Sequence, residues 1–268
     1  MTRRIVFLAL GLCTLLAGTA RANSLGTVEM RYSSAAPART ARIYLDGSIS
    51  NLNVYTGQYN LLLNPNYQPT GEGQGIYDAA ENGIIGAFCS DVHQYAPTGS
   101  TFRRYDVLYP EGAPIGGAND PDGMGIDKAD DLRWLFALFG GEYTDGSGDD
   151  NDDAAAFALC VWEIIFETRG QQYDVYDPAA RGAFYTTSGI GSFADTANQW
   201  LDAIEAISDP APDIALRILG SEGCQDYGLV ASGTGGNPAP EPLTMVGVFL
   251  GVCGLVAPIR RRLRPGRA

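Results

Sequence analysis

Residues 152–168 read DDAAAFALCVWEIIFET, a segment whose centre is apolar on nearly every side. A helix that is apolar all round is buried, so we expect this one to lie in the core. Asp152 and Asp153 open the segment, and their negative charge suits the positive end of a helix dipole.

Two further segments carry helical patterns, one on each side of this helix. Residues 127–140, DKADDLRWLFALFG, have an acidic first turn and end at Gly140. Residues 192–209 place apolar and polar side chains on opposite faces of a helix. These start and stop signals are typical of helices in globular proteins. The three segments together form the helical portion of the chain.

The segments outside this portion alternate apolar and polar residues, with Gly, Asn and Ser between them. Such alternation predicts half-buried strands. The strand-like segments are residues 27–34, 40–55, 58–64, 83–95, 102–110 and 226–232. We therefore expect an α+β fold, in which a helical portion is inserted into an antiparallel β portion.

The N-terminus has the pattern of a secretory signal peptide over residues 1–22. Arg3 and Arg4 precede an apolar stretch, and small residues around Ala20 and Ala22 suit cleavage. This order of charge, apolar run and small residues is that of an export signal. We expect signal peptidase to remove it, so that residues 23–232 form an extracellular domain.

The C-terminus has the pattern of a membrane segment. After a Gly/Pro linker at 233–239, residues 243–259 are 17 uncharged residues. That length is at the lower edge of what crosses a hydrocarbon core of about 30 Å. Five arginines follow, namely Arg260, Arg261, Arg262, Arg264 and Arg267. Such a cluster favours the cytoplasmic side, which predicts one transmembrane helix with the body outside.

The tripeptide Pro240-Glu241-Pro242 stands directly before this helix. PEP, a short apolar helix and an arginine cluster at the chain end resemble the PEP-CTERM sorting signal of Gram-negative exopolysaccharide-producing bacteria. The resemblance covers residues 240–268. It implies cleavage near the PEP by an exosortase, an inner-membrane intermediate, and a final place at the cell surface or outside the cell.

The charge of the body limits its partners. Residues 23–239 hold ten lysines and arginines against thirty aspartates and glutamates, a formal charge of −20. A surface this acidic repels nucleic acid and anionic lipid. We therefore expect no nucleic-acid partner.

Histidine and cysteine are scarce in the body. His93 is its one histidine, four residues after Cys89. On a strand the two side chains would face the same way, which makes a Cys–His pair possible, although a half-exposed strand histidine is the commoner case. The body cysteines are Cys89, Cys160 and Cys224, and an exported chain predicts one disulfide and one free thiol, with the pairing open. Cys160 is also explained as a small core residue.

Carboxylates concentrate in EYTDGSGDDNDD, residues 142–153. Hard cations such as calcium prefer oxygen ligands, and the candidate ligands are Asp145, Asp149, Asn151 and Asp153. An EF-hand loop beginning at Asp145 would need Gly at position 150 and Glu at position 156, where the chain has Asp150 and Ala156. We therefore expect a solvated acidic loop without a cofactor, with structural calcium as the alternative.

Two phrases, GAFCSDVHQY (86–95) and AAAFALCVWEII (154–165), resemble the thioester domains of bacterial surface adhesins. In that family a cysteine in the first phrase joins a glutamine in the second through an internal thioester. Cys89 matches the family cysteine, but Ala158 occupies the glutamine position and has no side-chain carbonyl. Gln171 and Gln172 lie past the helix. The resemblance therefore implies a relative that cannot form the family's bond.

These observations favour a non-enzymatic surface or extracellular-matrix protein, structural or adhesive in an exopolysaccharide layer. One alternative is a covalent, thioester-type adhesin that uses Cys89 with another acyl partner. Another is a secreted glycan hydrolase with a carboxylate pair at helical i, i+4 spacing, which brings side chains together. The candidate pairs are Asp149 with Asp153 and Glu163 with Glu167.

Overall fold

A computed structural model gives the architecture of the body. It describes residues 24–113, 123–144, 149–168, 170–176 and 183–230. Within these residues the chain is mixed α/β, with one antiparallel sheet and four α-helices. The expected combination of an antiparallel β portion and helices is therefore confirmed.

The strands pair in a closed circuit. β1 pairs with β2 on one side and with β5 on the other, and β2 connects back to β5 through β4, β8 and β7. Two short strands, β3 and β6, also pair with β1. The strands are β1 Gly26–Leu45, β2 Ile49–Leu63, β3 Thr70–Gly71, β4 Ile84–Cys89, β5 Arg103–Leu108, β6 Phe184–Thr186, β7 Leu216–Gly220 and β8 Tyr227–Val230.

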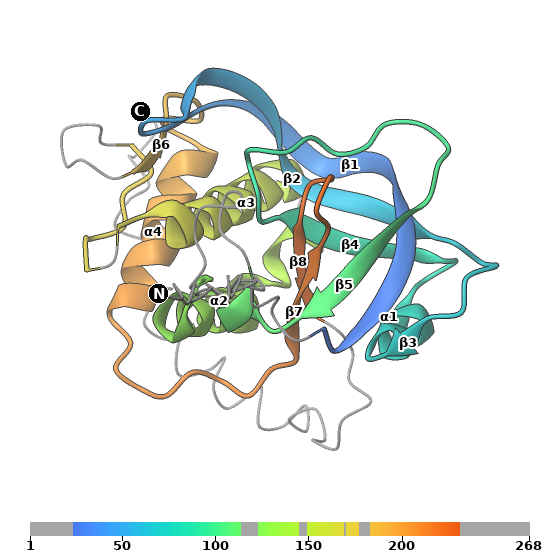
Figure 1. The fold of residues 1–268 in the computed structure, drawn as a ribbon. Coiled ribbons are helices and arrows are strands. Elements are labelled where there is room, and N and C mark those ends of the chain that lie inside the picture. The colour runs from blue at the N-terminus through green and yellow to red at the C-terminus, as the bar shows by residue number, and fades with distance from the viewer. Residues whose placement is uncertain (1–23, 114–122, 145–148, 169, 177–182, 231–268) are drawn as a thin grey trace, which may run out of the picture. The chain divides into compact units, whose positions relative to one another are not determined.

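β1 and β2 form a long hairpin that organises the circuit (Figure 1). Val28, Met30 and Ile43 of β1 are fully buried, as alternation along a half-buried strand requires. The hairpin closes where Leu45 pairs with Ile49. Gly47 in the turn has φ +74°, a conformation that glycine adopts without strain. This turn also carries Ser48, which contributes to the site described below.

The helices are α1 Gly73–Ala79, α2 Ile126–Phe139, α3 Asp150–Phe166 and α4 Phe193–Glu205. α3 contacts β1, β2 and β4, and it also contacts α2 and α4. Residues 154–165 are all buried. The expectation of a buried helix is therefore confirmed, and α2 and α4 confirm the two other expected helices.

The helical portion is inserted as expected, since α2, α3 and α4 follow β5 and precede β7. The expected strand at 83–95 is too long, because β4 ends at Cys89. In the described part of the chain, no helix is long and apolar enough to cross a membrane. The expected transmembrane helix at 243–259, the signal peptide and the linker lie outside the described residues.

Candidate functional site

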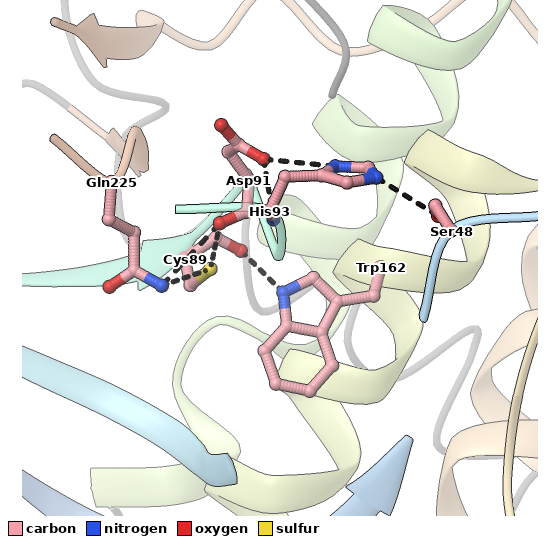
Figure 2. A network of polar contacts seen from close by, with 6 residues as sticks. All are labelled: Ser48, Cys89, Asp91, His93, Trp162 and Gln225. Atoms are coloured by element: carbon pink, nitrogen blue, oxygen red, sulfur yellow. Dashed lines mark hydrogen bonds and ion pairs between the residues drawn. The ribbon is translucent and has the colours of Figure 1, made fainter. Parts of the chain in front are cut away.

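Cys89 lies at the end of β4, where strand, helix and loop meet (Figure 2). Its thiol donates to the carbonyl oxygen of Asp91 at 3.2 Å and accepts from Gln225 Nε2 at 2.9 Å. The Cys89 carbonyl accepts the indole N–H of Trp162 at 2.9 Å. Cys89 is therefore held by α3 on one side and by the turn before β8 on the other.

The Cys89 thiol is protonated at neutral pH. Its side chain is 1 % exposed, and burial raises its pKa to about 12, although hydrogen bonds from its neighbours oppose the rise. The thiolate is the reactive form of cysteine. Cys89 is therefore a poor nucleophile toward molecules in solution.

The loop after Cys89 is fastened to the turn before β8. Ser90 donates its backbone N–H to the Asp226 carbonyl at 2.9 Å, and the Gln225 N–H reaches the Tyr95 carbonyl at 3.4 Å. Burial raises the pKa of the Asp226 carboxyl to about 7, and the charge of Asp91 adds to the rise. These contacts position residues 90–95 and bring Gln225 against the thiol.

His93 lies on this loop and joins a chain of three polar side chains. Its Nδ1 lies 3.3 Å from Asp91 Oδ1, and its Nε2 lies 3.1 Å from Ser48 Oγ (Figure 2). Neither the possible Cys–His pair on one strand nor the commoner strand histidine is found, because β4 ends at Cys89 and His93 lies on the loop that follows. The imidazole contacts Asp91 and Ser48, and Cys89 has Asp91 and Gln225 as partners.

The cysteines also differ from the expectation. Cys89, Cys160 and Cys224 are all buried and free, so the expected disulfide is wrong for these residues. Cys160 Sγ contacts the Ala197 carbonyl at 3.4 Å in the interface of α3 and α4. Cys160 is therefore a small core residue, as its apolar surroundings in the sequence indicated.

Ala158 lies on α3, one helical turn before Trp162, and is 1 % exposed. Its side chain is a methyl group, which has no carbonyl. Gln171 and Gln172 are exposed. The glutamine that contacts Cys89 is Gln225, which the sequence analysis missed, because 136 residues separate it from the cysteine.

The two candidate carboxylate pairs differ in burial and in contacts. Glu163 and Glu167 are 0 % and 1 % exposed, so this pair lies inside the fold. They accept backbone N–H groups from Asp174 and Ala183, which gives them a structural role. Burial raises the pKa of Glu163 to about 8. A glycan cannot reach this pair without the helix opening.

The described part of the acidic segment forms the N-terminal end of α3 and contacts β1. The carbonyl of Asp149 accepts the N–H groups of Asp152 and Asp153 in the first turn. Asn151 Oδ1 accepts the N–H of Ala38, and Asp152 pairs with Arg39 at 2.5 Å. Over the described ranges, no group of three or more His, Cys, Asp or Glu could hold a metal ion. Asp145 lies outside those ranges.

Comparison with known proteins adds no relative: no family model matches the chain, and neither curated proteins nor solved structures match it significantly. The sorting residues Pro240, Glu241, Pro242, Arg260, Arg261 and Arg262 lie outside the described residues. The site is therefore interpreted from its own geometry.

Proposed function

We propose that the protein is exported, that an exosortase processes its tail, and that its body serves a structural or adhesive role in an extracellular polysaccharide layer. Signal peptidase and the exosortase are the partners in its maturation, and polysaccharide is the partner outside the cell. The observation that supports the structural role is the burial of the Cys89 thiol. A protonated, buried thiol favours a stable binding domain over a reactive one.

Deletion of residues 240–268 tests the sorting step. Export by the signal peptide should persist, whereas the form cut near Pro240 and delivered to the cell surface should disappear. Immunoblots of cell-surface, envelope and medium fractions give the readout. The matched control, Asn237→Ala in the preceding linker, should mature like the parent. Unchanged location and processing of the deletion variant would contradict the proposal.

One observation favours a second function, that of a covalent adhesin. Gln225 Nε2 lies 2.9 Å from Cys89 Sγ, so the side-chain amide that the Ala158 position lacks is supplied from another part of the chain. Attack of Sγ on the Gln225 side-chain carbonyl would form the S–C bond and break the C–N bond. The thiol proton would leave with the nitrogen as ammonia. The resulting thioester could then acylate an amine on a host or matrix molecule.

This second function predicts a mass lower than that of the encoded chain by one ammonia. It also predicts one methylamine adduct at Gln225. Cys89→Ser and Gln225→Glu should each abolish the adduct, and Gln171→Glu, at an exposed glutamine, is the control that should keep it. Absence of both the mass deficit and a Cys89-dependent adduct would dismiss the covalent function and leave the structural one.

A further inference from the structure

Ser48, His93 and Asp91 stand in the order of a nucleophile, a base and an orienting carboxylate. Ser48 Oγ lies 3.1 Å from His93 Nε2, and His93 Nδ1 lies 3.3 Å from Asp91 Oδ1. The two ring nitrogens of His93 therefore face different partners (Figure 2). In the tautomer with the proton on Nδ1, the ring donates to Asp91 and accepts from the serine hydroxyl.

We call Ser48, His93 and Asp91 the relay. The two segments that carry these residues are both held in place by further contacts. Asp91 Oδ1 also accepts the backbone N–H of His93 at 2.8 Å, which ties the loop to the carboxylate. The Phe166 ring packs edge-on against the imidazole, with 5.8 Å between the ring centres. The turn with Ser48 is fastened by the Asp46 N–H to the Ala183 carbonyl at 2.8 Å and by the Ser48 N–H to the Leu45 carbonyl at 3.1 Å. Such support keeps reacting groups aligned.

The exposure of the side chains increases from Asp91 to His93 to Ser48, which is the order that nucleophilic catalysis requires. The Asp91 side chain is 3 % exposed and that of His93 is 28 % exposed, while Ser48 is exposed on its turn. The carboxylate is therefore shielded from water, and the serine hydroxyl is open to molecules in solution. A histidine that only bridged two loops would not need this gradient.

We propose that Ser48 is a nucleophile that takes the acyl group of a short carboxylic ester. His93 Nε2 accepts the Ser48 proton as Oγ bonds to the ester carbonyl carbon. The carbon–oxygen bond to the alcohol then breaks, and His93 returns the proton to the leaving oxygen. Water gives a proton to His93 and attacks the acyl carbon, and Ser48 regains its hydrogen as the acid leaves. Asp91 is a positioning residue, which orients the ring and stabilises its charged form.

An ester suits this site better than an amide. Because Ser48 is exposed, the acyl group remains in contact with water while it reacts. An alkoxide leaves more easily than an amine and needs less help from an enclosing site. A short acyl group also needs little binding surface. This inference goes beyond the proposed structural role and departs from the expectation of a non-enzymatic body.

A fluorophosphonate probe and p-nitrophenyl acetate test the inference on the protein recovered from outside the cell. The probe should form one adduct, which peptide mass spectrometry places on Ser48. Ser48→Ala should abolish both the adduct and the ester hydrolysis. His93→Gln should slow both by about 10²- to 10⁴-fold, the usual contribution of a general base. In Asp91→Asn, kcat should fall with little change in KM.

Ser50→Ala is the matched control, because Ser50 is also exposed and follows on the same hairpin; it should react like the parent. Ser48 lies on the surface, so its substitution tests the chemistry even where changes at Asp91 disturb the fold. Lack of an adduct on the parent, equal labelling of Ser48→Ala, or unchanged rates in His93→Gln would each overturn the inference. None of these readouts depends on how the tail is processed.

Discussion

Replacement of Phe157 by alanine is expected to lower the free energy of unfolding by about 3–5 kcal/mol, the usual cost of removing a buried aromatic ring. Phe157 is 0 % exposed and lies on the central helix α3. Its ring contacts those of Phe88, Phe136 and Tyr143, with centre distances of 4.5, 4.9 and 5.3 Å. Removing it leaves a cavity where β4, α2 and α3 meet.

Urea unfolding followed by circular dichroism measures this effect, and the slope of the transition checks that both variants unfold alike. Ile190→Ala is the control, because Ile190 is 71 % exposed. Its substitution should change the free energy of unfolding by less than about 0.5 kcal/mol. A loss below about 1 kcal/mol in Phe157→Ala would contradict the central place of this cluster.

The second large effect is a fall in stability as the pH rises. Burial raises the pKa of Glu163 from 4.5 to about 8. Below pH 4.5 the Glu163 carboxyl is protonated in both the folded and the unfolded state. The stability that comes from burying it in the protonated form is then fully present. Between 4.5 and about 8 the unfolded state releases the proton first, so the free energy of unfolding falls. The total loss is on the order of 5 kcal/mol at 1.36 kcal/mol per pKa unit.

Glu163→Gln should remove most of this pH dependence. The side-chain oxygen of glutamine can still accept the Asp174 N–H, and its amide stays neutral at every pH, as a protonated Glu163 is neutral. We therefore expect the variant to match the parent near pH 5 and to exceed its stability by several kcal/mol near pH 8.5.

Urea titrations at both pH values provide the measurement, with Glu81→Gln as the control at an exposed glutamate. The control should keep the pH dependence of the parent. The buried Asp226 carboxyl, whose pKa is raised from 3.8 to about 7, adds a fall of the same sign in every variant. Equal pH dependence in Glu163→Gln and the parent would show that Glu163 is already ionised in the folded protein.

Local patterns in the sequence predicted the longer elements whose apolar side chains are buried. The apolar run of α3 and the amphipathic pattern of α4 each lie within one element and report its burial, whereas the expected strand at 40–55 spans the end of β1, the turn and the start of β2. The short helix α1 was missed, because its seven residues have no acidic first turn and no side-chain cap. The strand β7 was missed, because five residues carry little periodicity.

The site could not be predicted in the same way, because it is made by contacts between distant segments. Cys89 and Gln225 are 136 residues apart, Cys89 and Trp162 are 73 apart, and Ser48 and His93 are 45 apart. Their meeting depends on how β1, β4 and β8 close the circuit of strands. The sequence indicated which residue types could react, and Cys89 and His93 were among them. It did not indicate their partners.

The free cysteines illustrate the same limit. An exported chain favours disulfides, but pairing also needs two thiols close together. Cys89 is held between β4 and the turn before β8, whereas Cys160 lies in the interface of α3 and α4. Cys89 and Cys160 therefore lie in different parts of the core, as a consequence of the packing.

The intact mass of the protein recovered outside the cell tests the central claim most directly. The account predicts a chain that begins near Asn23, ends near Pro240, and keeps the same mass after reduction, since the described cysteines are free. The variant without residues 240–268 should yield no product cut at this place. A secreted chain that still carries residues 243–259 would contradict the account.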